Sequence, residues 1–228
     1  MASPPYTIIG TPFSTFTRSI TLGMTHKGLK FNQVRVTPHS ETAYENHPFG
    51  FLPTLIIHEI DGKRVDLKLR ESQAIARYID RVAPEPSLHI SAGDGRSIIT
   101  EQMWEFVSLT GAHEFPAVEG GVVKPRVAAN DEGKLTDAEI RAKIDPGVTK
   151  LRKHLALMEA LMAPEGFVFG ETLSWADFFL FPLLADLRAV PEGELLSDRL
   201  RQWMAKMDEL DAVKATSAGT LSVGARPP

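Results

Sequence analysis

The residues best suited to chemistry in this sequence are polar side chains at expected helix starts. Glu71 and Ser72 open a helix directly after an expected strand. A hydroxyl and the free backbone N–H groups of a helix N-terminus bind a carboxylate, and a glutamate pairs with an ammonium group. The pair therefore suits the head group of an α-amino acid. In the alternative, Ser72 only caps the helix and Glu71 sits favourably at its dipole.

A second helix start, Thr11-Pro-Phe-Ser14-Thr-Phe-Thr-Arg18, offers several hydroxyl groups. A hydroxyl at such a position can donate a hydrogen bond to a bound thiolate and favour the ionised sulfur. No histidine and aspartate are arranged to activate a serine as a nucleophile. Simple helix capping is the alternative for the hydroxyl, and Arg18 is expected to make a structural ion pair.

A third candidate is the proline in Gly50-Phe-Leu-Pro53-Thr-Leu55, which comes just before an expected strand. A cis Leu52–Pro53 bond would turn the chain and expose the backbone N–H and C=O of Leu52. Those groups would then be free to pair with an extended peptide, as an added strand does. On spacing alone, a trans proline that starts an edge strand is the commoner arrangement.

Ser174-Trp-Ala-Asp177 is a helix capping box with Asp in place of Glu, ahead of a strongly apolar segment. The side chain of Ser174 is expected to bond to the N–H of Asp177, and Asp177 to reach back to Ser174. We interpret this pair as structural.

Composition and spacing exclude several kinds of site. The chain of 228 residues contains no cysteine, which excludes a disulfide framework, a thiolate metal site and protein-thiol redox chemistry. Its net charge of −4 includes no block of like charges, so neither nucleic-acid nor membrane binding is expected. The seven histidines show no metal-ligand spacing, and we expect no bound metal.

No segment has the pattern of a signal peptide or a membrane span. Met1–Tyr6 lacks a basic and an apolar region, and the longest apolar run, near Phe178–Leu184, is far too short to cross a bilayer. The sequence therefore predicts a soluble, cytoplasmic protein.

The first 83 residues predict a β-α-β unit, then a β-hairpin, then a helix. Asp61-Gly62 is a strong hairpin signal between two runs of strand-forming residues. The expected strands are Tyr6–Ile9, Phe31–Val36, Leu55–Ile57 and Val65–Leu69. Proline-rich residues 84–93 are interpreted as a linker.

Residues 94–228 predict an all-helical domain, because apolar residues recur there at helical spacing and no convincing strand is found. The expected helices include Ile99–Val107, Val148–Met162, Trp175–Leu187 and Leu196–Leu210. Pro182 is expected to kink the third of these or to mark a special first turn. The tail from Ala215 is expected to pack loosely.

Taken in order, these motifs resemble the cytosolic glutathione transferase family. The resemblance is carried by Asn46–Leu55, Leu69–Ile79 and Ser174–Asp177, and it covers nearly the whole chain. It implies an α/β plus all-α fold, with a thioredoxin-like N-terminal domain and a helical-bundle C-terminal domain. It also implies glutathione as co-substrate, and a homodimer that contacts through the Glu71 helix region of one chain and the second domain of the other.

The resemblance further implies how glutathione is held. Leu52, before a cis Pro53, would pair with the cysteinyl part, while Glu71 and Ser72 would hold the γ-glutamyl end. A basic residue usually meets the glycyl carboxylate, and His39 is the candidate here.

The thiol-activating residue has two candidates. Ser14 lies four residues before Arg18, as in the Ser-x-x-x-Arg register of theta- and phi-like enzymes. Thr11 occupies the position of the cysteine in the Cys-Pro-Phe of omega-like enzymes, which argues against deglutathionylation. We prefer Ser14 and place Thr11 second. The first loop is also similar to that of fungal serine-type transferases, some of which act mainly as ligand carriers.

The pocket for a hydrophobic electrophile is expected between the loops of the first domain and the first helix of the second. Its candidate residues are Phe13, Met103, Trp104, Phe106 and Phe115, which periodicity does not separate from core residues. The predicted activity is conjugation of glutathione to hydrophobic electrophiles. The alternatives are a non-catalytic carrier of glutathione and aromatic ligands (a ligandin), a protein-interaction module, and a glutathione-dependent lyase or isomerase.

Overall fold

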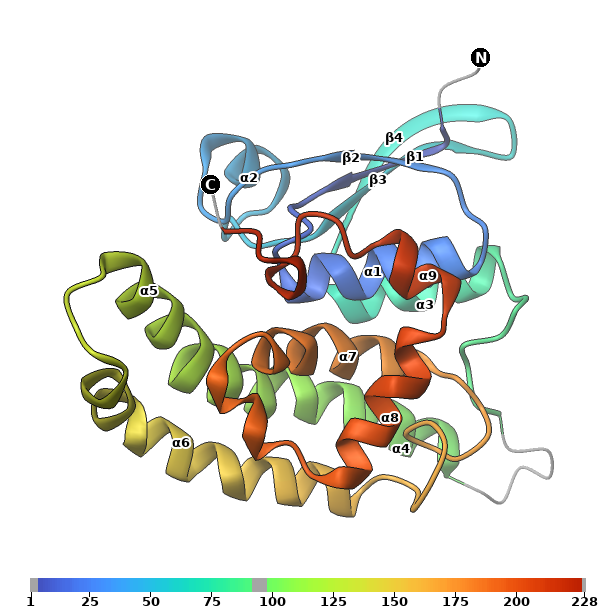
Figure 1. The fold of residues 1–228 in the computed structure, drawn as a ribbon. Coiled ribbons are helices and arrows are strands. Elements are labelled where there is room, and N and C mark those ends of the chain that lie inside the picture. Colours follow the sequence, from blue (N-terminus) through green and yellow to red (C-terminus); the bar gives the residue numbers. More distant parts are fainter. Residues whose placement is uncertain (1–3, 92–97, 227–228) are drawn as a thin grey trace. The chain divides into compact units, whose positions relative to one another are not determined.

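The computed structural model describes residues 4–91 and 98–226, and the chain divides into two compact units (Figure 1). The first unit comprises Met1–His89 together with Glu209–Pro228, and the second comprises Ile90–Asp208. The division near residue 89 falls within the predicted linker, of which residues 92 and 93 lie outside the described part. The second unit ends at Asp208, whereas the prediction gave residues 94–228 to the helical domain; the described residues from Glu209 to Arg226 belong to the first unit.

A four-stranded mixed sheet forms the centre of the first unit, in the order β2-β1-β3-β4. β1 pairs with β2 in parallel, and the other two pairings are antiparallel. Asp61 and Gly62 make the predicted hairpin turn with positive φ values of 51° and 74°. The strands are β1 (Tyr6–Ile9), β2 (Phe31–Val34), β3 (Thr54–Ile60) and β4 (Lys63–Arg70).

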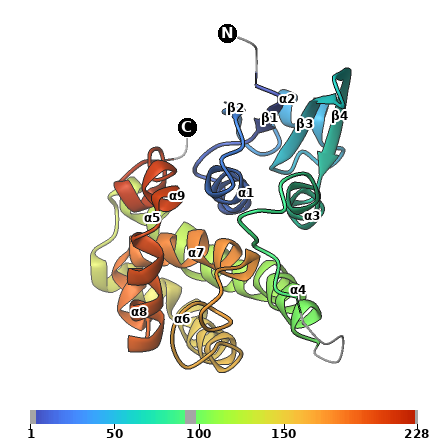
Figure 2. The same ribbon diagram turned by 90° about the vertical axis from the view of Figure 1, so that its right-hand side faces the viewer.

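Two helices, α1 (Thr15–His26) and α3 (Ser72–Val82), lie side by side on one face of this sheet (Figure 2). Gly10, between β1 and α1, has no room for a side chain, because a Cβ there would collide with the side chain of Thr17. A short helix, α2 (Glu41–Asn46), precedes the loop that leads to β3. The predicted β-α-β unit, hairpin and closing helix are therefore all present.

The C-terminal segment packs against α1. It contains α9 (Asp211–Ala215), which contacts α1, and a 3-10 turn at Leu221–Val223. Thr220 and Leu221 are buried, and Arg18 donates from Nη1 to Ser222 Oγ at 3.4 Å. The prediction of a loosely packed tail is therefore wrong. Tertiary burial of two residues orders a segment whose composition is small and polar.

Lys27 ties the end of α1 to the end of α3. Its side chain is fully buried, and Nζ lies 3.0 Å from Asp80 Oδ1. The same ammonium donates to the carbonyls of Ala83 and Pro86, each at 2.8 Å. One buried cation thus fixes the chain where it leaves α3.

Replacing Lys27 by methionine is expected to lower the free energy of unfolding by about 2–3 kcal/mol, because it leaves a carboxylate and two carbonyls without this donor. Denaturant unfolding followed by circular dichroism measures the change. Lys30→Met is the matched control, since Lys30 is exposed. Equal midpoints for the two variants would show that the Lys27 contacts contribute nothing.

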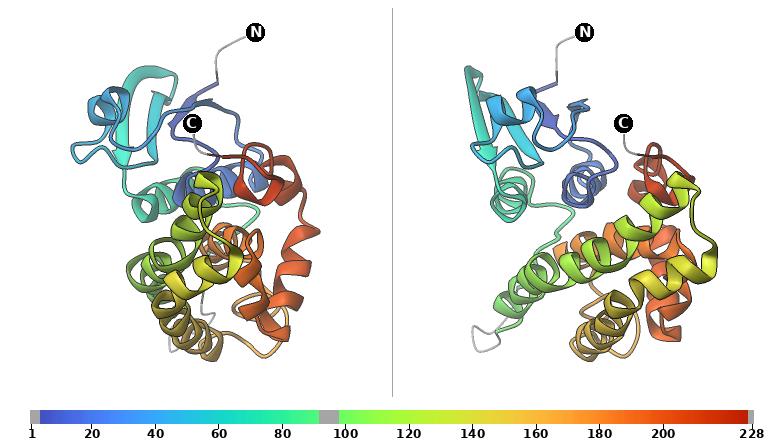
Figure 3. Two further views of the ribbon diagram at one scale, coloured as in Figure 1. Left: turned by 60° about the vertical axis from the view of Figure 1, so that its left-hand side comes forward. Right: turned by 90° about the vertical axis from the view of Figure 1, so that its left-hand side faces the viewer.

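The second unit is helical. Among its described residues there is no strand, only two isolated bridges, which pair Phe167 with Gly170 and Phe169 with Thr172. α7 is buried along nearly its whole length and packs against α4, α8 and the π-helical turn η2; Figure 3 shows these helices from two sides. The helices are α4 (Ile99–Leu109), η1 (Thr110–Glu114), η2 (Pro116–Val123), α5 (Lys124–Glu132), α6 (Asp137–Ala160), α7 (Trp175–Arg188), η3 (Pro191–Leu195, a 3-10 turn) and α8 (Asp198–Asp208).

These elements match four of the predicted helices and add features that were not predicted. The π-helical run Thr110–Glu114 and Pro116–Val123 was not foreseen. Pro182 lies inside α7, which continues to Arg188. Gly147 of α6 faces Gly121 so closely that a Cβ there would collide with the Gly121 carbonyl, and this contact lets the two backbones approach.

Asp177 forms the predicted capping box with Ser174 at the start of α7. Its buried carboxylate accepts the backbone N–H of Ser174 at 2.9 Å and its hydroxyl at 3.0 Å. It also accepts the N–H of Val168 at 2.7 Å and Trp203 Nε1 at 2.9 Å. Burial raises the pKa of Asp177, and the four hydrogen bonds oppose that rise. One carboxylate therefore joins α7 to the preceding turn and to α8.

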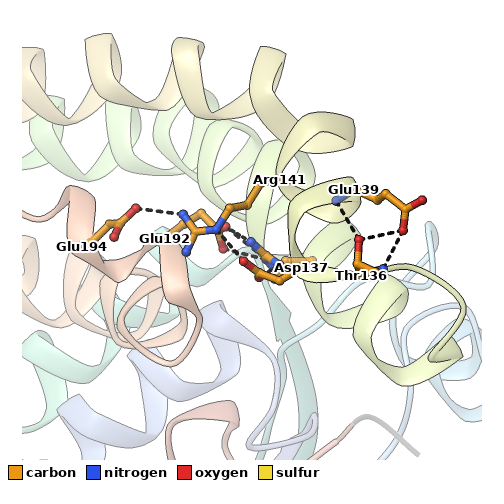
Figure 4. A network of polar contacts seen from close by, with 7 residues as sticks. Thr136, Asp137, Glu139, Arg141, Glu192 and Glu194 are labelled. Atoms are coloured by element: carbon orange, nitrogen blue, oxygen red, sulfur yellow. Dashed lines mark hydrogen bonds and ion pairs between the residues drawn. The ribbon is translucent and has the colours of Figure 1, made fainter.

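Arg126 joins α5 to η3 and to the start of α6 from a fully buried position. Its Nε donates to both oxygens of Glu192, at 2.9 and 3.1 Å, and Nη1 donates to Asp137 Oδ1 at 2.7 Å. Figure 4 shows how the network continues from Asp137 to Arg141 and on to Glu194. Partners so far apart in the sequence give no local signal, so this network was not predicted.

Candidate functional site

The strand register brings three candidate segments to one end of the sheet. Ile9, the last residue of β1, pairs with Thr54, the first residue of β3, and Thr54 pairs with Arg70, the last residue of β4. The segments that adjoin these residues therefore emerge side by side. They are the loop from Gly10 to Ser14, the Leu52–Pro53 dipeptide, and Glu71-Ser72.

The Leu52–Pro53 peptide bond is cis, as the resemblance implied. Among the residues that the structure describes, none pairs with the backbone N–H or C=O of Leu52. β3 begins only at Thr54, so these groups lie just outside the ladder. They are available to an extended peptide.

Glu71 is the residue that precedes α3, and Ser72 is the first residue of the helix. No side chain among the described residues caps this helix, whereas Ser14 caps α1 and Ser40 caps α2. The capping role considered for Ser72 is therefore not what the structure shows. The first N–H groups of α3 are left for a ligand carboxylate.

The backbone of Glu71 has a φ of 65° and a ψ of 114°. A residue other than glycine in this region costs on the order of 1–3 kcal/mol, and such residues concentrate at functional sites. The Glu71 side chain is 77% exposed. Its carboxylate is therefore accessible to a ligand ammonium.

His47 was missed as a site residue, although it belongs to the motif that carries the resemblance. Its Nε2 lies 3.3 Å from Glu71 Oε1, and the histidine side chain is only 3% exposed. The two residues are 24 positions apart in the chain. Only the fold brings them together, so spacing in the sequence contains no signal for the pair.

Ser14 and Thr11 both lie in the loop after β1. Ser14 Oγ accepts the N–H of Thr17 at 3.4 Å, and Thr11 Oγ1 accepts the N–H of Phe13 at 3.3 Å. Each hydroxyl therefore keeps its own proton for donation to a ligand. Ser14 alone stands at a helix N-terminus, where the dipole adds to the stabilisation of a negative charge.

His39 lies against the loop that leads to Pro53. Its backbone N–H donates to the Gly50 carbonyl at 2.8 Å, and its exposed ring lies edge-on to Phe51 at 5.2 Å between centroids. His39 Nδ1 is 3.3 Å from the Tyr44 hydroxyl. The candidate histidine is thus close to the proline loop.

The five candidate pocket residues differ in burial. Met103, Trp104 and Phe106 of α4 are buried, and Phe106 lies edge-on to Phe169 at 6.1 Å. Phe13 and Phe115 keep part of their surface exposed. Burial thus favours a core position for the three α4 residues, and it leaves Phe13 and Phe115 better able to contact a ligand.

Glu114, next to Phe115, is a buried carboxyl group that sequence reasoning missed. It ends the π-helical turn η1 with 1% of its side chain exposed, and His154 Nδ1 of α6 lies 3.5 Å from its Oε2. Burial raises the pKa of Glu114 to about 7. Burial also raises the pKa of Glu119, on the next π-helical turn, against the opposing effects of Lys124 and Asp186.

The raised pKa of Glu114 predicts a fall in stability as the pH rises from about 4.5 to 7. In this window the folded chain keeps a proton that the unfolded chain has lost. Glu114→Gln should remove the part of the fall that Glu114 causes, while the part caused by Glu119 remains, and add about 2 kcal/mol to the free energy of unfolding at pH 8. Burial lowers the pKa of His154, so the contribution of this histidine to stability rises with pH. That contribution is present in both proteins.

Denaturant midpoints measured at a series of pH values test the role of Glu114. Glu101→Gln, at an exposed position of α4, is the matched control and should follow the parent protein. Parallel pH profiles for the parent and Glu114→Gln would contradict the prediction.

In the described ranges, 4–91 and 98–226, no helix is long and apolar enough to cross a membrane. No group of three or more His, Cys, Asp or Glu within the same ranges has an arrangement that could hold a metal ion.

Comparisons with known proteins give matches to one family along nearly the whole chain. The family model "Glutathione S-transferase, N-terminal domain" matches residues 8–87, and "Glutathione S-transferase, C-terminal domain" matches residues 128–206. Glutathione S-transferase F7 of Arabidopsis thaliana is 23% identical, over 91% of this chain and 96% of its own length. Glutathione S-transferase 4 of Zea mays is 29% identical, over 86% of this chain and 83% of its own length.

A similar solved structure is that of glutathione S-transferase I bound with lactoylglutathione. It has a TM-score of 0.73 and 21% identity, and the match covers 94% of this chain and 99% of that one. These matches confirm the predicted fold class, a thioredoxin-like domain followed by a helical domain.

Proposed function

Because this chain belongs to the glutathione S-transferase family, we propose that it conjugates the thiolate of glutathione to hydrophobic electrophiles. The observation that best supports the proposal is the sheet end described above. There, the backbone of Leu52 and the N-terminus of α3, which have no partner or side-chain cap among the described residues, lie beside the exposed carboxylate of Glu71. The named relatives are transferases, which favours turnover over the carrier, interaction-module and lyase alternatives.

In the proposed complex, glutathione lies extended along Pro53. Its cysteinyl N–H and C=O pair with the backbone of Leu52. Its γ-glutamyl carboxylate accepts hydrogen bonds from the Ser72 hydroxyl and the first N–H groups of α3, and its ammonium pairs with Glu71. His39 is the proposed partner of the glycyl carboxylate.

Ser14 is the proposed thiol-activating residue, with Thr11 second. The glutathione thiol releases its proton to solvent, and the Ser14 hydroxyl donates a hydrogen bond to the sulfur anion at the positive end of α1. The sulfur lone pair then forms a bond to an electrophilic carbon, and a leaving group departs with the electrons of its own bond. The rate comes from the raised thiolate fraction and from proximity.

The proposed function also includes the contacts of the electrophile, the type of enzyme and its oligomeric state. Phe13 and Phe115, with the α4 residues Met103, Trp104 and Phe106, are the proposed contacts of the electrophile. The reliance on Ser14 makes this a serine-type enzyme, as proposed for the theta- and phi-like register. A homodimer in the cytoplasm is the proposed state of the protein, on the family resemblance.

Isothermal titration with glutathione, beside a conjugation assay with a model aryl halide, tests the proposal. Binding with turnover supports a transferase. Binding without turnover would instead indicate a non-catalytic ligand carrier. An absence of binding would mean that Pro53 and Glu71-Ser72 serve only as scaffold, and the proposed function would fail.

A further inference from the structure

His47 and Glu71 form a pair in which a buried ring holds an exposed carboxylate. A glutamate side chain that is 77% exposed ordinarily samples many rotamers. Here Oε1 of Glu71 lies 3.3 Å from Nε2 of His47, whose side chain is 3% exposed. A rigid group in the protein interior therefore restrains a mobile group at the surface.

The position and the tautomer of the His47 ring are both fixed by its own loop. The backbone N–H of Phe49 donates to His47 Nδ1 at 3.1 Å, so this nitrogen carries a lone pair and the ring proton lies on Nε2. The His47 backbone N–H donates to the Ala43 carbonyl at 2.7 Å. The rings of Phe49 and Phe51 lie 6.1 and 5.8 Å from the imidazole, centroid to centroid. Nε2–H is consequently the donor and Glu71 Oε1 the acceptor.

This bond connects two segments that bind different parts of the proposed substrate. His47 begins the loop that continues to Leu52 and Pro53, while Glu71 precedes α3. With Oε1 engaged by the ring, Oε2 remains for the ligand ammonium. Restraint of the carboxylate before the ligand arrives lowers the entropy cost of binding.

We propose that His47 is a positioning residue, which orients Glu71 toward the γ-glutamyl ammonium and so sets a preference for glutathione over thiols that lack the γ-glutamyl group. This inference rests on the proposed function.

The test compares glutathione with cysteinylglycine, which keeps the thiol and the glycyl end but lacks the γ-glutamyl group. In His47→Leu, KM for glutathione should rise about five- to tenfold, while kcat at saturating glutathione and KM for cysteinylglycine stay within about twofold. His47→Gln supplies an amide N–H toward Glu71 and should recover most of the loss.

His58→Leu is the matched control. His58 is also paired with a carboxylate, since its Nδ1 lies 2.6 Å from Asp66 Oδ1, but it is within β3, away from the candidate segments. Loss of the His58 ring should leave the ratio of KM for glutathione to KM for cysteinylglycine unchanged.

The outcomes separate this inference from the function on which it rests. If the parent protein binds no glutathione, the proposed function fails and the inference fails with it. If the parent turns over but His47→Leu raises both KM values equally, His47 only supports its loop and the inference is overturned.

A ligand-free measurement covers the case in which His47→Leu does not fold. Nitrogen-15 NMR of the histidine rings in the parent should show Nε2 of His47 protonated and Nδ1 bare, and Glu71→Gln should shift the Nε2 resonance. A proton on Nδ1, or no response to Glu71→Gln, would overturn the inference.

Discussion

Replacing Ser14 by alanine is expected to slow conjugation of a model aryl halide about 100-fold, while the affinity for glutathione changes by less than about threefold. The hydroxyl that would donate to the sulfur stands at the N-terminus of a 12-residue helix. Without this donor the pKa of the bound thiol should rise by about two units. At an assay pH below the parent's thiol pKa, this lowers the thiolate fraction, and hence the rate, by about the same 100-fold.

The rate assay is combined with a titration of thiolate absorbance in the glutathione complex, which reports the pKa shift directly. Thr11→Ala is the matched control and should lose less than about threefold, because Thr11 is not at a helix end. The loss of the cap also costs about 1 kcal/mol of stability, so both variants are compared well below their melting temperatures. An active Ser14→Ala enzyme beside an inactive Thr11→Ala enzyme would transfer the role to Thr11.

Asp177→Ala is expected to lower the free energy of unfolding by about 3–5 kcal/mol, the largest stability effect predicted here. The carboxylate is buried and accepts four hydrogen bonds, from Ser174, Val168 and Trp203. Alanine leaves all of these donors buried without an acceptor. Because they belong to the start of α7, the preceding turn and α8, their loss loosens three elements at once.

Chemical denaturation of the parent and Asp177→Ala gives the change. Asp198→Ala removes an aspartate from the first turn of α8 whose side chain is 92% exposed, and it should cost less than about 0.5 kcal/mol. Asp177→Asn keeps one acceptor oxygen and should fall between the two. A common midpoint for Asp177→Ala and Asp198→Ala would show that the buried network contributes no stability.

Local chemistry in the sequence was enough to predict the elements that position the site. Asp61-Gly62 supplies the two positive φ values that a tight hairpin requires, and this fixes β3 against β4. Ser14 and the Ser174-Asp177 box mark helix starts through hydrogen bonds that span three residues. Each of these signals acts over a few positions, so it can be read without the fold.

The features that were missed depend on contacts between distant residues. His47 meets Glu71, and Arg126 meets Glu192, only after the chain has folded. The π-helical run from Thr110 contains three glycines and a proline, a composition that gives no helical period to detect. The placement of Glu209–Pro228 on the first unit depends on burial of Leu221. Most neighbours of Leu221 in the sequence are small or polar, so they give no signal for this burial.

The return of Glu209–Pro228 to the first unit has a consequence for the order in which the protein matures. N-terminal domains commonly fold while the ribosome is still adding residues. Here the cover of α1, from α9 to Ser222, is synthesised after the helical unit. In the nascent first unit, one side of α1 therefore stays uncovered until the helical unit has been translated. Completion of the first unit therefore depends on translation of the helical unit, and expression of residues 1–89 alone would yield an incomplete unit.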